Sequence, residues 1–412
     1  MADKKQKEVN VVAGIDLGNG YVKSGVSVEG GNQVTRVFPS VALKRYSTHF
    51  DDVEKEPTKE FVDEIVDRMD VSYVSPLIRE TVRRSFGQSA LTSGQPLEQF
   101  DVHSPVSKAT VDISGSLILA VLGAEVLAHL FNTNGKYPMG DKVVANVNLA
   151  TALPIEEYRQ HHRDYASKFL NEGDAHTVIF HNFERPITID LVIKNVHIAN
   201  EGEAAQYGLM FADDKFLKVI EESVKQDYPN GEFKELKGKD FIQAENTLGI
   251  DIGEGTIDFA VFSDGRFNPT ASSTMSQGYG NVLESTLDTL QREGTPYKSR
   301  KQLSELIYSE KNAFNRGRIE RIESVNQGHI EQFANVVADE VSKVFNRVGG
   351  FIDVIFVYGG GAGPLEKALF DKINHRIEQS NLMEGALPIV YLDSGYSRYL
   401  NVQGLVALAK YL

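Results

Sequence analysis

One short motif occurs twice in the chain, near the N-terminus and again past the middle. Each copy is a β-favouring apolar run that ends in Asp and continues through two glycines, at residues 16–20 and 251–255. A strand that turns tightly through glycine exposes backbone N–H groups that can approach a phosphate, and the adjacent aspartate can hold a hydrated Mg²⁺. The duplication predicts two related domains that contact one nucleotide from opposite sides.

Composition restricts the classes of protein to be considered. A chain of 412 residues is too long for one ordinary hydrophobic core, so we expect at least two domains. The absence of Cys excludes a disulfide framework, a thiolate metal site and a cysteine nucleophile. A net charge of −14 disfavours direct nucleic-acid binding; it suits a basic protein partner, and simple solubility explains it equally well.

Neither a secretory signal nor a membrane span is expected. Residues 1–8 are polar and charged, unlike the apolar core of a signal peptide. The longest apolar run, at 117–130, is interrupted by Gly123, Glu125 and His129, and it is shorter than a bilayer requires. We interpret this run as a buried helix and expect a cytoplasmic protein with no membrane contact.

Hydrophobic periodicity predicts strands and helices throughout both halves. In the first half, strands are expected at 11–16, 21–28, 34–38, 143–153, 177–180 and 187–193, and helices at 107–131, 155–170 and 201–211. In the second half, strands are expected at 247–251, 256–263, 267–274, 354–358 and 389–392, and helices at 282–292, 330–348, 365–379 and 401–412, with a helical region at 299–322. The charge-rich segment 46–82 is interpreted as a mobile insertion, and the charge-rich segment 215–240 as a surface insertion.

Two further glycine segments suit a nucleotide. Gly278 and Gly280 precede a predicted helix whose N-terminus can face an anion. Gly359, Gly360 and Gly361 follow a predicted strand, and a backbone without Cβ atoms can lie flat against a ring or a phosphate. These segments are therefore candidates for contact with the same ligand as the two Asp–Gly turns.

Lys23 lies on the strand that leaves the first turn, on the same face as Asn19 and Tyr21. This placement would let its ammonium group reach a β- or γ-phosphate. A solvated lysine on an exposed strand face is the alternative interpretation.

Five separated segments resemble, in order, the motifs of the actin-like ATPase superfamily, which also includes sugar kinases and heat-shock chaperone ATPases. They are the first phosphate motif at 16–23, the first connecting motif at 147–154, the second phosphate motif at 251–256, the adenosine motif at 354–364 and the second connecting motif at 401–405. Within the superfamily the chain is most similar to the bacterial plasmid-segregation actins, the ParM-like group. That similarity lies in Asp-Leu-Gly-Asn-Gly-Tyr-Val-Lys at 16–23, Leu-Pro-Ile-Glu-Glu-Tyr at 153–158 and Asn-Val-Gln-Gly-Leu at 401–405.

The resemblance implies an α/β fold of two actin-like domains, each a mixed sheet with flanking helices, and a nucleotide in the interdomain cleft. Domain I would span residues 1–151, with a C-terminal helix at 401–412 that returns to it. Domain II would span residues 152–400 and include the charged insertion at 215–240.

The resemblance also implies roles for particular residues. Asp16 and Asp251 would organise Mg²⁺, and Asp251 and Glu201 would place the attacking water, with Glu203 as the alternative to Glu201. The residues expected to bind the nucleotide are Gly18, Asn19, Gly20, Tyr21, Lys23, Gly253, Glu254, Gly255, Thr256, Gly278, Glu310, Lys311, Gly359, Gly360, Gly361 and Ala362.

Three members of this set have equally simple explanations. Glu254 could instead be an exposed turn residue, because a carboxylate near phosphate must be screened by the metal. Glu310 and Lys311, on a predicted helix, would meet the ribose and adenine, and a solvated helical ion pair explains them as well.

The function implied is that of a cytoskeletal filament protein for plasmid DNA segregation. It would hydrolyse MgATP, or the GTP complex, to ADP or GDP and phosphate, and so drive filament turnover. Its partners would be further copies of itself and a basic DNA-binding adaptor, with no direct contact to nucleic acid. A small-molecule kinase of the same fold is the alternative, for which no dedicated catalytic Asp stands out.

Overall fold

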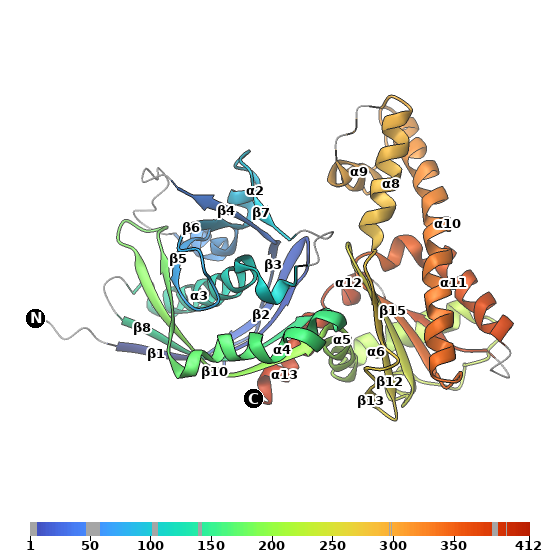
Figure 1. Cartoon of the computed structure of the whole chain (residues 1–412), viewed down its shortest axis with the longest axis horizontal. Helices are drawn as coiled ribbons and strands as arrows, with labels where there is room; N and C mark the ends of the chain where they lie inside the picture. Colours follow the sequence, from blue (N-terminus) through green and yellow to red (C-terminus); the bar gives the residue numbers. More distant parts are fainter. Residues whose placement is uncertain are drawn as a thin grey trace, which may run out of the picture. The chain divides into compact units, whose positions relative to one another are not determined.

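The computed structural model describes residues 6–46, 58–100, 106–138, 142–295, 297, 299–380, 386–392 and 394–412. The chain forms two compact units. Unit 1 comprises Met1–Phe211 and Tyr399–Leu412, and unit 2 comprises Ala212–Arg398. Each unit has its own sheet and its own hydrophobic core (Figure 1).

Unit 1 contains, within its described residues, a ten-stranded mixed sheet in the order β3-β2-β1-β8-β10-β9-β5-β6-β4-β7. The strands are β1 (Gln6–Leu17), β2 (Tyr21–Val28), β3 (Val34–Pro39), β4 (Val41–Arg45), β5 (Asp70–Val74), β6 (Arg83–Phe86), β7 (Glu98–Gln99), β8 (Lys142–Leu153), β9 (His176–Phe180) and β10 (Ile187–Asn200). Strands β1, β8 and β10 are parallel to one another, and the strands outside them pair antiparallel.

The helices of unit 1 cover both faces of this central parallel part. They are α1 (Lys59–Asp63), α2 (Gly87–Leu91), α3 (Asp112–Asn134), α4 (Ile155–Leu170), α5 (Glu201–Met210) and α13 (Leu400–Lys410), with short 3₁₀ turns at Ile65–Asp67, Lys108–Thr110 and Asn171–Gly173. Leu149 of β8 belongs to the core that contains α3, whereas the next residue, Ala150, packs with Leu405 of α13. Because successive strand residues point to opposite faces, α3 and α13 lie on opposite sides of the sheet.

Helix α3 is the core helix of unit 1. By length and composition it could cross a membrane, with a mean hydropathy of 1.8 in its most apolar window, but 94% of that window is buried inside the protein. Its buried face packs on the strands of unit 1 (Figure 1). The prediction of a buried helix at this run is therefore confirmed.

Unit 2 contains, in the part that the structure describes, a six-stranded sheet in the order β13-β12-β11-β15-β16, with β14 paired to β12. The strands are β11 (Thr247–Ile252), β12 (Ile257–Ser263), β13 (Arg266–Phe267), β14 (Ser273–Met275), β15 (Val354–Tyr358) and β16 (Ile389–Tyr391). The helices are α6 (Asp214–Asp227), α7 (Gly238–Ile242), α8 (Tyr279–Arg292), α9 (Arg300–Ile307), α10 (Arg316–Arg347), α11 (Ala362–Ser380) and α12 (Ser394–Ser397). Helices α10 and α11 run side by side (Figure 1).

The division between the units differs from the predicted boundary between residues 151 and 152. Strand β10 pairs in parallel with β8 from residue 189 to residue 200, and α5 follows β10 directly. This ladder ties the segment after the first connecting motif into the sheet of unit 1. Residues 152–211 therefore belong to unit 1, together with the C-terminal helix α13.

The two predicted insertions form regular elements of the units wherever the structure describes them. The segment 215–240 forms most of α6, which buries Phe216, Ile220 and Val224 on one face. The described part of 46–82 forms α1, a 3₁₀ turn and β5, whereas residues 47–57 lie outside the described residues. These segments are amphipathic, and their high content of charge hid a buried stripe at helical spacing.

Two predicted elements of unit 2 are divided. The strand expected at 267–274 is split into β13 and β14 by a turn in which Asn268 accepts hydrogen bonds from the backbone of Ala271 and Ser272. The helical region expected at 299–322 is split into α9 and the start of α10. In both cases asparagine side chains bond to nearby backbone N–H groups and so compete with the regular element.

Helices α5 and α13 cross at backbone contact. A Cβ atom added to Gly404 would lie 1.8 Å from the carbonyl oxygen of Ala204, and one added to Gly208 would lie 2.4 Å from the carbonyl oxygen of Leu400. Only glycine allows this approach, which locks the C-terminal helix onto the helix that begins at Glu201.

Replacing the crossing glycine should destabilise unit 1. We expect Gly404→Ala to lower the free energy of unfolding by about 1–3 kcal/mol, because the added methyl group forces α5 and α13 apart. Urea unfolding followed by circular dichroism measures the change. The matched control is Gly328→Ala, at an exposed site of α10 where the added Cβ meets nothing within 4 Å. Its expected effect is a gain of up to about 1 kcal/mol, and equal midpoints for the two variants would contradict the tight crossing.

Candidate functional site

The two glycine turns lie at the tips of hairpins with the same register. In β1–β2 the position of Asp16 pairs with Lys23, and in β11–β12 the position of Asp251 pairs with Asp258. A third strand runs parallel to the first in each unit, β8 beside β1 and β15 beside β11. The repeated sequence motif is therefore also a repeated structure.

Both hairpins need glycine at the first turn position. A Cβ atom at Gly18 would lie 2.7 Å from the carbonyl oxygen of Tyr21, and one at Gly253 would lie 3.0 Å from that of Thr256. At these distances a side chain would push the two strands of the hairpin apart at its tip. The Asp-x-Gly spacing thus has a steric reason that is the same in both units.

In unit 1 the carbonyl side of the turn is fixed by Ser40. Its hydroxyl donates to the carbonyl oxygen of Gly18 at 2.7 Å, and its backbone N–H donates to that of Gly20 at 3.0 Å. Asn19 is half-buried, and Tyr21 is exposed. With its carbonyl groups held by Ser40, the turn keeps one conformation.

Asp16 is buried at the end of β1. The Lys23 ammonium group lies 3.3 Å from its carboxylate, across the hairpin. The alternative of a freely solvated Lys23 is wrong in this structure, because the side chain is directed to Asp16. Lys23 therefore lies beside the first turn, next to Asp16, the carboxylate that is expected to bind Mg²⁺.

In unit 2 three predicted segments meet around Asp251. The N–H of Gly361 donates to the carbonyl oxygen of Ile252 at 2.8 Å. Gly359 has φ +96°, and a Cβ atom there would lie 2.3 Å from the Asp251 carboxylate. The glycine-rich turn after β15 therefore packs directly against the second hairpin, while Gly360 is exposed and Ala362 is buried at the start of α11.

The third segment is the N-terminus of α8. The N–H groups of Tyr279 and Gly280 donate to the carbonyl oxygens of Gly253 and Glu254 at 3.0 and 2.8 Å. The N–H of Gly278 donates to the Asn281 side chain at 2.8 Å. The first turn of α8 therefore binds the hairpin, which differs from the expectation that it faces an anion.

Close packing explains the glycines at this helix end. A Cβ atom at Gly278 would lie 2.5 Å from the carbonyl oxygen of Gly253. Tyr279 anchors the helix on its other side, where its hydroxyl accepts from the Asn326 amide of α10 at 3.1 Å. Burial raises the pKa of Tyr279 to about 12, so this hydroxyl stays protonated at neutral pH.

The remaining residues of the second turn differ in exposure. Gly255 is buried and Thr256 is half-buried, whereas the Glu254 side chain is exposed. The guanidinium group of Arg300, from α9, lies 3.9 Å from the Glu254 carboxylate and 3.9 Å from that of Glu284. Glu254 is thus an exposed turn residue with a cationic neighbour.

Glu310 and Lys311 are not on a helix, so their predicted placement was wrong. They lie in the loop between α9 and α10, and both are exposed. The Lys311 ammonium group pairs with Glu323 of α10 at 2.7 Å. Within this loop the Asn312 side chain accepts from the N–H of Phe314 at 2.9 Å, and the Asn315 amide donates to the carbonyl oxygen of Glu310 at 3.0 Å.

Glu201 is the first residue of α5, after the N-cap residue Asn200. Its carboxylate lies 3.8 Å from the Lys108 ammonium group, which donates to the carbonyl oxygen of Leu17 at 2.9 Å. The Glu203 carboxylate instead lies 3.3 Å from His197. The structure therefore connects Glu201, and not Glu203, with the first hairpin.

Lys108 was missed at the level of sequence. It stands in the 3₁₀ turn Lys108–Thr110 before α3, and it is buried. In the sequence Lys108 is a single lysine before a long apolar helix, a pattern that usually indicates a solvent-exposed residue at the helix end. Its position beside Leu17 depends on a contact across 91 residues of chain.

Within the described residues, no group of three or more His, Asp or Glu side chains could hold a metal by itself. Mg²⁺ that arrives with phosphates needs only one or two carboxylates, because phosphate and water supply the other ligands. Asp16 and Asp251 fit this requirement, since each is the second-last residue of its strand and stands beside a glycine turn. The Asp251 carboxylate occupies space that a Cβ atom at residue 359 would otherwise fill.

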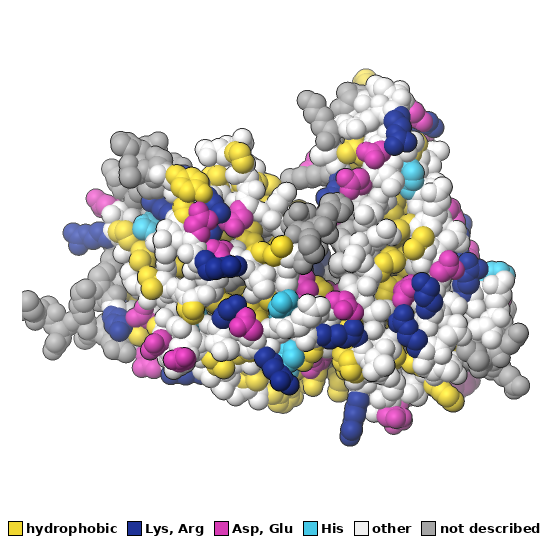
Figure 2. Space-filling view, in the orientation of Figure 1, with side chains coloured by type: hydrophobic (Ala, Val, Ile, Leu, Met, Phe, Trp, Pro, Cys, Tyr) yellow, Lys and Arg dark blue, Asp and Glu magenta, His cyan; other side chains and the backbone are white. Residues whose placement is uncertain are grey.

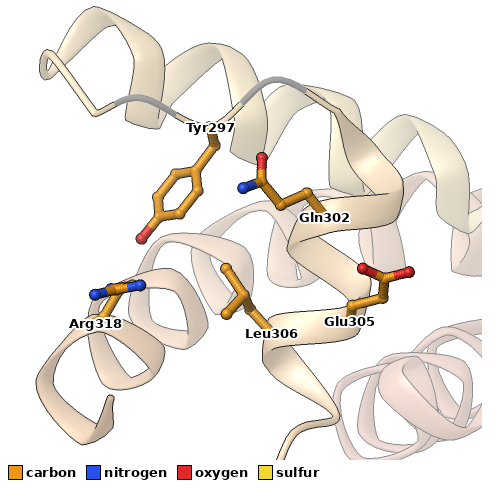
Figure 3. A pocket seen from close by; sticks show the side chains of 5 residues that line it. All are labelled: Tyr297, Gln302, Glu305, Leu306 and Arg318. Carbon is orange, nitrogen blue, oxygen red and sulfur yellow. The ribbon is translucent and has the colours of Figure 1, made fainter. Parts of the chain in front are cut away.

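A pocket of about 450 Å³ lies elsewhere in unit 2, between α9 and α10. It is lined by Tyr297, Gln302, Glu305, Leu306 and Arg318. Figure 3 shows that Gln302, Glu305 and Leu306 come from one helix, with Tyr297 and Arg318 on the opposite side. None of these residues belongs to the predicted site, so the pocket and the glycine turns are separate features.

Two neighbouring glycines test the packing around Asp251. We expect Gly359→Ala to lower the free energy of unfolding of unit 2 by about 1–3 kcal/mol, because it adds both left-handed strain and a clash. Gly360→Ala is the control, since its Cβ meets nothing within 4 Å, and its effect should stay within about 0.5 kcal/mol. Thermal unfolding by calorimetry measures both. Equal losses in the two variants would show that Gly359 is not specially packed.

Comparison with known proteins gives matches to actin-like proteins. Residues 249–371 match the family model described as archaeal actin homologue MreB-like, C-terminal. The structure of the actin-like protein Alp7A aligns with a TM-score of 0.66 and 17% identity, over 98% of this chain and 96% of Alp7A. ParM of Bacillus thuringiensis in its apo form aligns with a TM-score of 0.52 and 16% identity, over 97% and 96%. No curated protein matched the sequence.

An archaeal actin homologue, Ta0583, aligns with a TM-score of 0.58 and 14% identity, over 98% of this chain and 99% of that one. At identities this low the alignments establish the fold, and they do so over nearly the whole of each chain. Two units with mixed sheets and flanking helices agree with them. The chain therefore has the actin-like fold, as its resemblance to the ParM-like group predicted.

Proposed function

We propose that the chain is a filament-forming, actin-like ATPase for plasmid DNA segregation. The observation that supports it most is the pair of hairpins with one register, each with an aspartate and an obligatory glycine at the same positions. Two such half-sites suit a ligand with several phosphates and a metal ion. ParM of Bacillus thuringiensis, which has a similar fold, has been solved with ATP.

The hairpin tips would bind the phosphates. Residues 18–20 and 254–256 would donate backbone N–H groups, whereas the Gly253 N–H already donates to the carbonyl oxygen of Thr256 at 2.9 Å. Lys23 would add positive charge close to Asp16. Asp16 and Asp251 would hold Mg²⁺ through water, and the bound ion would neutralise charge that develops on the phosphoryl oxygens. The turn at 359–362 would contact the nucleoside, with exposed Gly360 offering open backbone.

Hydrolysis would depend on the placement of one water molecule. Glu201 would accept a hydrogen bond from this water. Its carboxylate lies beside the first hairpin, because Lys108 contacts both this carboxylate and the carbonyl oxygen of Leu17. Asp251 would orient the same water from the second hairpin. The Asp251 carboxylate has room there because residue 359 is a glycine, and an added Cβ atom at this position would lie 2.3 Å from it.

The proposed partners are further copies of the chain and a basic DNA-binding adaptor in the cytoplasm. A net charge of −14 suits a basic protein and opposes direct contact with DNA. On the face seen in Figure 2, lysine and arginine side chains are interspersed with acidic ones, which is unlike a DNA-binding stripe. Whether the base is adenine or guanine is an outcome of the nucleotide tests below.

Filament formation should require the triphosphate. We expect the protein to pellet at high speed with MgATP or MgGTP and to stay in the supernatant with the diphosphate, because γ-phosphate contacts would join both hairpins to one ligand. The measurement is the pelleted fraction against protein concentration. A protein that stays monomeric with every nucleotide and phosphorylates a sugar would instead support the kinase alternative.

Phosphate release should depend on Asp251. We expect Asp251→Asn to lower the release rate about 100-fold while nucleotide binding is retained, since the change removes a charge that orients water. The matched control is Asp264→Asn, an exposed turn aspartate in the same unit, which should keep the parental rate. Equal rates in Asp251→Asn and the parent would remove Asp251 from the mechanism.

A further inference from the structure

Lys108 is a buried cation whose main chain is anchored. Only 9% of its surface is exposed. Its backbone N–H donates to the Glu157 carboxylate of α4 at 2.7 Å, and the Ser107 hydroxyl donates to the same carboxylate at 2.5 Å. The 3₁₀ turn that carries Lys108 is therefore fixed to α4, and this fixes the position of the Lys108 backbone.

The ammonium group connects two parts of the proposed site. It donates to the carbonyl oxygen of Leu17, the last residue before the first turn, at 2.9 Å. It also lies 3.8 Å from the Glu201 carboxylate and 5.7 Å from the centre of the Phe100 ring. Burying a charge is costly unless it is paired, so this lysine depends on both oxygen partners.

In unit 2 a different donor binds the carbonyl oxygen that corresponds to that of Leu17. The residue equivalent to Leu17 in the second hairpin is Ile252, and its carbonyl oxygen accepts from the backbone N–H of Gly361 at 2.8 Å. Unit 1 has no such glycine turn after β8, which continues through Leu153 into α4. A charged side chain thus replaces a neutral backbone donor at equivalent carbonyl groups.

We propose that Lys108 is a positioning residue for phosphate hydrolysis, which holds the first hairpin and Glu201 in one arrangement; this inference rests on the function proposed above. The peptide that joins Leu17 to Gly18 is planar, so fixing its oxygen also fixes the direction of the Gly18 N–H. The ammonium charge offsets the repulsion between the Glu201 carboxylate and a nearby triphosphate. A neutral side chain at position 108 could keep the hydrogen bond to Leu17, but it would not offset the repulsion between Glu201 and the triphosphate.

Two substitutions of Lys108 separate charge from hydrogen bonding, and a third variant is the control. Lys108→Gln keeps a donor for the Leu17 carbonyl but removes the charge, and we expect about a tenfold lower rate of phosphate release at saturating nucleotide, with affinity for a non-hydrolysable analogue changed less than about threefold. Lys108→Arg keeps the charge and should recover at least about a third of the parental rate. Lys142→Gln, which removes an exposed lysine paired with Asp190 in the same unit, is the control and should match the parent.

A double-mutant cycle then tests the link to Glu201. If Lys108 acts through Glu201, adding Lys108→Gln to Glu201→Gln should lower the rate less than about twofold further. Independent, multiplying losses would overturn the proposal, as would a parental rate in Lys108→Gln. Equal losses of rate and thermal stability in Lys108→Gln and Lys108→Arg would likewise overturn it, since they indicate a packing role.

The parent protein distinguishes this inference from the proposed function. A parent that binds nucleotide but releases no phosphate overturns both. A parent that releases phosphate, together with an unchanged Lys108→Gln, overturns only the role of Lys108.

Discussion

The close packing of backbone around two Asp–Gly turns is the constraint on which the rest of the structure depends. At Gly18 and Gly253 a single Cβ atom would meet the carbonyl oxygen across the hairpin. Each turn is then held from outside, by Ser40 in unit 1 and by the N-terminus of α8 in unit 2. Because the turns are rigid, the carboxylates beside them have fixed positions, and a proposed phosphate site has fixed donors.

The two units use one strand plan with different supports. In each, an antiparallel hairpin is joined to a third, parallel strand. Around the second hairpin the supports are backbone N–H groups from Gly361 and α8, whereas around the first they are the hydroxyl and backbone N–H of Ser40 and the side chain of Lys108. The duplicated scaffold therefore carries an asymmetric pair of half-sites, since in the described part of the chain the buried Lys108 contacts the first hairpin and backbone N–H groups support the second.

Much of the fold could be predicted because its signals are local. The bounds expected for β2 and α4 match the structure, since alternation, helical spacing and the proline before Ile155 are all read from neighbouring residues. Glu310 and Lys311 were misplaced because they lie in a loop between α9 and α10, where asparagine side chains bond to nearby backbone groups. The boundary between the units was misplaced because the pairing of β8 with β10 leaves no local trace.

The sequence by itself determined the repeated strand–turn–strand motif, because the demand for glycine at a tight turn and for alternating burial acts over a few residues. It also determined the two acidic positions and the order of the motifs. Only the tertiary structure decided that α8 binds the hairpin instead of facing an anion, and that Lys108 meets both Leu17 and Glu201. Such contacts join residues far apart in the chain, and no local pattern encodes them.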